Sequence, residues 1–129
     1  MTRPRSVRLV CQAWLTLACY DVIHALFGFR GITRWLSHQR GRTAAAGPHT
    51  DAAVLDAVSL ACCFYWKSVL CLQRSVCTAA LLRTRGVRAQ LVIGYRPVPF
   101  LSHAWVEVDG RVVNDSQAYQ KRLVILHTV

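Results

Sequence analysis

The chain has 129 residues, 53% of them hydrophobic, which is enough for one compact domain with a core of its own. Sixteen Lys and Arg residues against six Asp and Glu residues give a formal net charge of +10, so the surface is either suited to acidic partners or simply solvated. The sequence has no RNA-binding aromatic motif and no zinc-finger spacing, and we expect no nucleic-acid partner.

Residues 9 to 29, LVCQAWLTLACYDVIHALFGF, form an apolar run that three Arg residues precede. The run is long enough to cross a membrane. Gln12, Asp21 and His24 argue against a membrane span, because polar and ionisable groups are costly inside a bilayer. We therefore expect a buried amphipathic helix within a helical N-terminal part, residues 1–40, and a cytoplasmic protein without a membrane anchor.

The chain contains six cysteines, which are Cys11, Cys19, Cys62, Cys63, Cys71 and Cys77. A disulfide framework suits a secreted, loop-rich chain, whereas this chain is apolar and has no convincing export signal. No C-x-x-C occurs, and the histidines do not fall at zinc-ligand spacings near cysteine pairs. Most of the thiols are therefore expected to be reduced core residues, and no metal or cofactor is expected.

The remaining elements follow in chain order. RGRTAAAGPHT, residues 40–50, is typical of a linker, and a continuous block spans residues 51–129. In this block DAAVLDAVSLACCFYW and CLQRSVCTAALLRTR predict two helices, the second ending at Gly86, and AQLVIGYR, SHAWVEV and RVVND alternate as strands do. The order indicates a single α+β domain over residues 1–129.

Helix geometry separates the two cysteines of the second helix. Six residues at about 100° each place Cys77 about 120° around the axis from Cys71. Cys71 lies in the first turn, where free N–H groups and the positive end of the helix dipole stabilise a thiolate. Cys71 is therefore the candidate nucleophile, and Cys77 is expected to pack in the core.

A thiolate nucleophile needs a base, and the base needs an acceptor that orients it. His103 and Asp115 lie on two consecutive predicted strands, in LSHAWVEVDGRVVND. The order of a thiol at a helix start, then His and Asp on adjacent strands, is that of papain-like and transglutaminase-like enzymes. The residues alone leave an alternative open, in which His103 is a hydrogen-bonded core residue, Asp115 belongs to a turn and Cys71 is one more buried thiol.

The register of this hairpin decides whether the two side chains can meet. A two-residue turn at Asp109-Gly110 places Asp115 opposite Ala104, pointing away from His103. A three-residue loop at 108–110, with Gly110 in the left-handed bulge position, places Asp115 directly opposite His103. We expect the second register.

The runs CLQRS, LLRTRGVRAQLVIGYR and HAWVEVDGRVVND resemble, in this order, the leader peptidases of lasso-peptide biosynthesis, the B2 proteins of the transglutaminase-like superfamily. The resemblance is close over roughly residues 65–116 and looser over residues 9–36. It implies a papain/transglutaminase-like core with Cys71 as nucleophile, His103 as general base and then general acid, and Asp115 as the group that orients His103. Val69-Leu70 replace the polar or proline-containing turn often found before the nucleophile. The sequence therefore does not identify which N–H groups, besides that of Cys71, would form the oxyanion hole.

The activity implied by the resemblance is removal of the leader from a ribosomally made lasso-peptide precursor. The first 64 residues show no strands of a leader-binding domain, so a separate leader-binding (B1) protein and an ATP-dependent cyclase are the expected partners, with Trp14, Trp35 and Trp66 as core or contact residues. Three alternatives remain. They are a transglutaminase-like acyltransferase that uses an amine as acceptor, a non-catalytic peptide-binding module on the same fold, and a small membrane-associated basic protein in which residues 9–29 face lipid.

Overall fold

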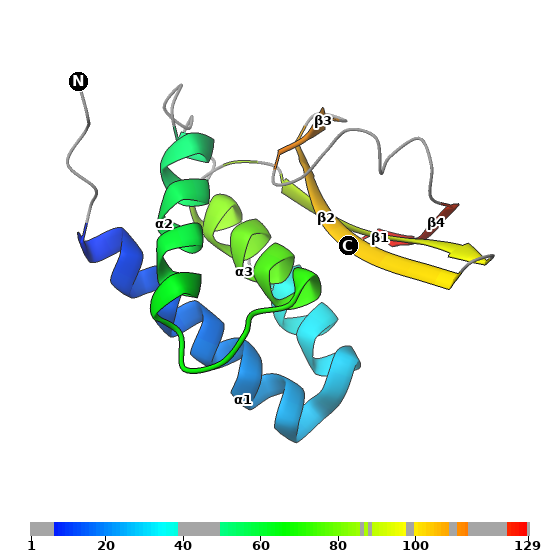
Figure 1. Ribbon diagram of the computed structural model, residues 1–129, viewed down its shortest axis with the longest axis horizontal. Helices are drawn as coiled ribbons and strands as arrows, with labels where there is room; N and C mark the ends of the chain where they lie inside the picture. Colours follow the sequence, from blue (N-terminus) through cyan, green and yellow to red (C-terminus); the bar gives the residue numbers. More distant parts are fainter. Residues whose placement is uncertain are drawn as a thin grey trace.

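The structure is a computed structural model, and it describes residues 7–38, 50–85, 87, 89–97, 100–108, 111–113 and 124–128. Three helices precede an antiparallel sheet (Figure 1). The elements are α1 (Val7–His38), α2 (Thr50–Phe64), α3 (Cys71–Thr84), β1 (Ala89–Pro97), β2 (Phe100–Val108), β3 (Arg111–Val112) and β4 (Val124–Thr128). This arrangement confirms the α+β class.

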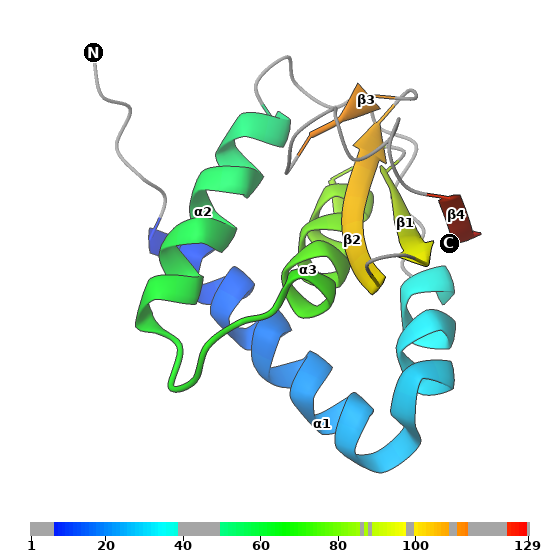
Figure 2. The ribbon, with the colours of Figure 1, turned by 45° about the vertical axis from the view of Figure 1, so that its right-hand side comes forward.

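Helix α3 lies at the centre of the molecule, between the other two helices and the sheet (Figures 1 and 2). Every residue from Ser75 to Leu82 is buried. A helix that is covered all round needs small or apolar side chains on every face. The run SVCTAALL meets this requirement, because its two hydroxyl groups make hydrogen bonds to backbone carbonyls.

The sheet has the strand order β3-β2-β1-β4, and all its neighbouring strands are antiparallel. Because side chains alternate between the two faces of a strand, Leu91 and Val106 join the main core beneath the helices. Val92, Trp105 and Val112 form a second apolar cluster on the opposite face. The two faces of β2 therefore have different roles, one in the core and one around Trp105.

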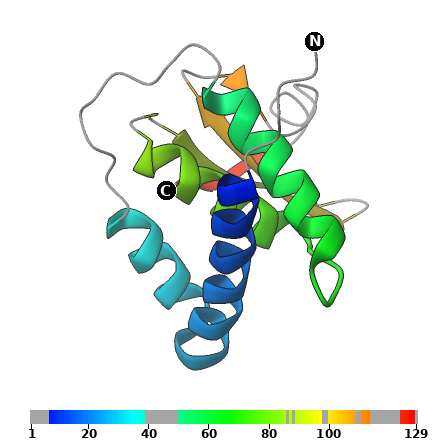
Figure 3. The ribbon, with the colours of Figure 1, turned by 90° about the vertical axis from the view of Figure 1, so that its left-hand side faces the viewer.

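Helix α1 bends sharply at Gly28, where φ is 68° and ψ is −161°. This backbone region is accessible almost only to glycine. Figure 2 shows the two arms of the helix meeting at an angle, and Figure 3 shows both arms from another side, in blue and in cyan. Ile32 and Leu36 on the second arm are fully buried, so the bend folds the end of α1 back onto the core.

The expected helix over residues 9–29 is confirmed, but it is buried along one stripe only. Leu9, Ala13 and Leu17 pack in the core, whereas a second apolar stripe that includes Leu15 and Leu26 is exposed. Among the described residues, α1 is the helix that is long and apolar enough to cross a membrane by length and composition. Of its 18-residue apolar stretch, 22% is buried in the protein.

The expectation that most cysteines lie in the core is wrong. All six thiols are free, but Cys11, Cys19, Cys63 and Cys71 are exposed, Cys62 is partly buried, and Cys77 is fully buried. The reason is that α1 and α2 carry more apolar residues than one buried stripe can hold. Their cysteines occupy the remaining, outward positions.

The other predicted elements can be compared with the structure segment by segment. The helices of residues 51–66 and 71–85 and the strands of residues 89–96 and 102–108 are confirmed within two residues at each end. Strand β4 was not predicted. Most of the linker 40–50 and Gly86 lie outside the described residues, and the division into a single domain stays a prediction.

Candidate active site

Cys71 is the first residue of α3, and its side chain is exposed. The first helical hydrogen bond runs from the N–H of Arg74 to the carbonyl of Leu70 at 3.0 Å. The backbone N–H groups of Cys71, Leu72 and Gln73 therefore precede the hydrogen-bonded part of the helix and point out of its N-terminus. The accessible Cys71 thiol therefore lies beside unsatisfied N–H donors at the positive end of the helix dipole.

Cys77 has the opposite environment on the same helix. Its side chain is 0% exposed. Burial, with smaller contributions from Cys62, Asp21 and Cys19, raises the pKa of this thiol well above its usual value. Cys77 is thus a protonated core residue at neutral pH, which confirms that it packs.

His103 lies near the start of β2, on the sheet face that also carries Trp105. The two rings stack with their centroids 6.3 Å apart and an interplanar angle of 25°. Trp105 is fully buried, and its indole N–H donates a hydrogen bond to the Glu107 carboxylate at 3.1 Å. The partly exposed imidazole therefore packs against a buried aromatic ring.

The residue opposite His103 on β1 is Gly94. Gly94 has no side chain, so only backbone lies directly opposite the imidazole on β1. The pairing of β1 with β4 also shifts register between Ile93 and Gly94. Bulges and glycines of this kind occur often beside active sites, where they give a functional side chain room.

One hydrogen bond links the start of α3 to the strand of His103. The Ser75 hydroxyl donates to the carbonyl of Ala104 at 3.1 Å, in the core. Ser75 lies one helical turn, about 6 Å, beyond Cys71, and Ala104 directly follows His103. Helix α3 and strand β2 begin at the same end of the molecule (Figure 2). The backbone segments of Cys71 and His103 therefore lie at the same end of the molecule, but the His103 side chain lies on the Trp105 face of β2, whereas α3 packs on the other face.

The polar residues of CLQRS each hold α3 to a different element. The Gln73 side chain donates to the carbonyl of Leu17 on α1 at 3.0 Å, and Arg74 donates to the Ser59 hydroxyl on α2 at 2.7 Å. Ser75 makes the bond to β2 described above. The sequence alone gives these three residues no assigned role, although buried polar side chains at the start of a helix need hydrogen-bond partners and so indicate contacts that fix its position.

The hairpin register that was predicted to bring Asp115 opposite His103 is wrong. Glu107 pairs with Val112, and Val108 pairs with Arg111, which is the register of a two-residue turn. Asp-Gly is a sequence that two-residue hairpin turns favour, so the local turn preference prevails over the longer loop. Strand β3 ends at Val112.

Asp115 itself lies outside the described residues, as does the whole segment 114–123. Its assignment as the group that orients His103 therefore stays a prediction that rests on the family resemblance. Within the described part of the chain, no group of His, Cys, Asp and Glu side chains is arranged to hold a metal ion.

Comparison with known families gives the context for this arrangement. The sequence model of the Transglutaminase-like superfamily matches residues 14–128. The chain belongs to this superfamily. Membership confirms the fold that CLQRS and the two later motifs indicated.

One relative narrows the comparison within the transglutaminase-like superfamily. The microcin J25-processing protein McjB of Escherichia coli is 43% identical over 56 residues. This stretch covers 43% of the chain and 27% of McjB, so the chain matches about a quarter of the relative's length. No solved structure matches the chain.

Proposed function

We propose that the chain is a cysteine peptidase that removes the leader peptide from a lasso-peptide precursor. The observation that carries the proposal is the exposed thiol of Cys71 at the start of the central helix, which Ser75 and Ala104 connect to the strand of His103. Membership of the transglutaminase-like superfamily and the similarity to a microcin-processing protein support the same chemistry.

In the proposed mechanism His103 accepts the proton of the Cys71 thiol, and the thiolate attacks the carbonyl carbon of the last leader residue. The N–H groups at the start of α3, that of Cys71 first, stabilise the oxyanion, a contribution worth on the order of 10² to 10³ in rate for one donor. His103 then protonates the leaving amine as the C–N bond breaks. Water hydrolyses the leader thioester and regenerates the thiol, with Asp115 orienting His103 throughout.

The proposal includes partners and a compartment. The substrate is a precursor peptide, recognised together with a separate leader-binding (B1) protein. The amine released from the core peptide is joined to a side-chain carboxylate by an ATP-dependent lasso cyclase. The chain acts in the cytoplasm. The basic composition, with a net charge of +10, suits partners that carry acidic groups.

The test is mass spectrometry of a precursor peptide incubated with the chain and a leader-binding protein. We expect cleavage of one bond by the wild-type protein and by Cys77→Ala, and a loss of at least about 10³-fold with Cys71→Ala, because the nucleophile is removed. Cys77→Ala is the matched control, because Cys77 lies on the same helix.

Other outcomes separate the alternatives. An intact peptide with folded wild-type protein would favour a non-catalytic binding module. Transfer of the leader to an added amine faster than to water would favour a transglutaminase-like acyltransferase. Cleavage that survives Cys71→Ala would remove the assigned nucleophile.

A further inference from the structure

The start of α3 is not fixed by a side-chain capping interaction. Leu70, the N-cap residue, has an extended backbone with φ −82° and ψ 166°, and its side chain makes no capping hydrogen bond. The segment 65–70 before it contains neither helix nor strand, and Trp66 and Leu70 are each 73% exposed. An apolar N-cap contributes little to a helix start. The position of Cys71 must therefore be fixed from outside this segment.

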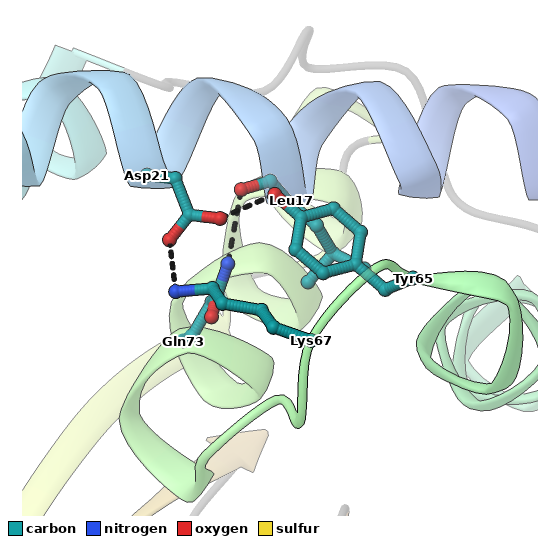
Figure 4. Close-up of polar contacts among 5 residues, drawn as sticks. All are labelled: Leu17, Asp21, Tyr65, Lys67 and Gln73. Atoms are coloured by element: carbon teal, nitrogen blue, oxygen red, sulfur yellow. Dashed lines mark hydrogen bonds and ion pairs between the residues drawn. The ribbon is translucent and has the colours of Figure 1, made fainter.

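Asp21 on α1 provides such a contact. Its carboxylate accepts a hydrogen bond from the Tyr65 hydroxyl and forms an ion pair with Lys67 at 2.6 Å (Figure 4). Tyr65 is buried and packs against Trp14, with ring centroids 5.4 Å apart. Two residues of the segment before Cys71 thus converge on one carboxylate.

The same stretch of α1 also holds the chain after Cys71. Gln73 is buried, and its side-chain amide donates to the carbonyl of Leu17 at 3.0 Å (Figure 4). Leu17 and Asp21 are one helical turn apart and so lie on one face of α1. Cys71 is therefore bracketed, with Tyr65 and Lys67 held before it and Gln73 held after it.

The protonation states of Asp21 and Tyr65 favour their hydrogen bond at neutral pH. Burial raises the pKa of Asp21, but hydrogen bonds from Lys67, Tyr65 and Gln73 outweigh burial and lower the pKa below its usual value. Burial, and then the bond to Asp21, raises the pKa of Tyr65 to about 12. At neutral pH the carboxylate is thus ionised, and the phenol keeps the proton that it donates.

We propose that Asp21 is a positioning residue for the Cys71 nucleophile, acting through Tyr65 and Lys67 on the segment that leads into α3. This inference rests on the proposed peptidase function. Asp21 is the single acidic residue in the apolar stretch of residues 9–29. In this role, α1 would position the nucleophile as well as pack against the core.

The experiment compares the full-length variants Asp21→Asn, Asp21→Glu and Asp56→Asn in precursor cleavage. Asp56 is the matched control, because it is an exposed aspartate on α2 outside this cluster. We expect Asp21→Asn to lower kcat by about tenfold or more with KM changed less than about twofold, since a misplaced nucleophile slows chemistry without weakening peptide binding. Asp21→Glu should restore most of kcat, and Asp56→Asn should leave it unchanged.

Hydrogen–deuterium exchange provides a readout that does not depend on cleavage. Asp21→Asn should speed exchange in a peptide that covers residues 65–73 by about tenfold, while exchange in β1 and β2 stays as in the wild type. If Asp21→Asn alters neither kcat nor this exchange, or if it speeds exchange while kcat stays unchanged, the positioning role is overturned.

Two further variants apply if Asp21→Asn does not fold. Tyr65→Phe and Lys67→Met each remove one donor to the carboxylate and keep most of the side-chain volume. Each should lower kcat severalfold, and unchanged kcat in both would overturn the inference. If the wild-type protein cleaves no precursor, the proposed function fails, and the exchange comparison still decides whether Asp21 holds the segment.

Discussion

At the scale of single residues, the two cysteines of α3 differ in exposure and in the environment of the thiol. Cys71 is exposed at the helix start, and Cys77, about 1.7 turns later, is fully buried. Iodoacetamide should therefore modify Cys71 in the native protein and Cys77 only after unfolding, because alkylation requires an accessible thiolate. Peptide mapping of the labelled protein would check this, and early labelling of Cys77 would contradict its burial.

The raised pKa of Cys77 also predicts how stability depends on pH. The unfolded chain loses this proton near the usual thiol pKa of 9.0, whereas the folded protein keeps it to higher pH. The unfolded state then binds fewer protons, so the free energy of unfolding should decrease as pH rises above about 9. Urea unfolding at several pH values should show a shallower decrease for Cys77→Ala than for the exposed control Cys63→Ala. Equal slopes would exclude Cys77 as the cause.

The residue scale also shows where sequence reasoning succeeds and fails. Helix geometry placed the two cysteines on different faces, and the predicted helix boundary placed Cys71 in the first turn; both predictions are confirmed. The predicted pairing of β2 with β3 was wrong, because the alternation of side chains is compatible with two registers and the length of the turn determines which one forms. Asp21 was noted only as a charge in an apolar run, since its partners are more than 40 residues away in sequence.

At the scale of elements, α3 is held to β2 by the buried hydroxyl of Ser75. Ser75→Ala should lower the free energy of unfolding by about 1 kcal/mol through the lost hydrogen bond, and should also reduce kcat, because the bond that fixes the start of α3 to β2 is lost. Thr78→Val is the matched control, as this hydroxyl bonds only within α3, to the carbonyl of Arg74. It should cost similar stability and leave kcat unchanged. Equal kcat in the two variants would contradict the link.

The bend of α1 depends on one backbone conformation. No atom lies within 4 Å of a Cβ built on Gly28, so Gly28→Ala meets no steric obstacle other than its own backbone. With φ at 68° and ψ at −161°, the substitution should cost about 1 to 3 kcal/mol in the free energy of unfolding. Urea denaturation monitored by circular dichroism would measure it. Unchanged stability would show that the helix does not need this conformation.

The elements themselves were predictable to different degrees. The positions of the helices and of the first two strands could be predicted from the periodicity of apolar residues and from Gly and Pro residues at the ends of the elements. Strand β4 was missed because VILHT is short and follows a polar segment, and it gains its partner only from β1. The bend at Gly28 was missed because a glycine inside a helical pattern is compatible with a straight helix as well.

At the scale of the whole molecule, function depends on a central helix that three other elements hold by separate polar contacts. Gln73, Arg74 and Ser75 fix α3 to α1, α2 and β2, respectively. The fold class and family followed from three short motifs, whereas this set of contacts followed only from the structure. The long-range contacts join residues with no local pattern in common, and sequence periodicity does not encode them.

The central claim is that Cys71 forms a covalent bond with the leader during cleavage. The most direct measurement is peptide mapping after an acid quench of the chain with a precursor peptide and a leader-binding protein. The account predicts a leader acyl group on Cys71, released by hydroxylamine as a thioester would be. Cleavage that proceeds with the acyl group on another cysteine, or in Cys71→Ala with no acyl group at all, would contradict it.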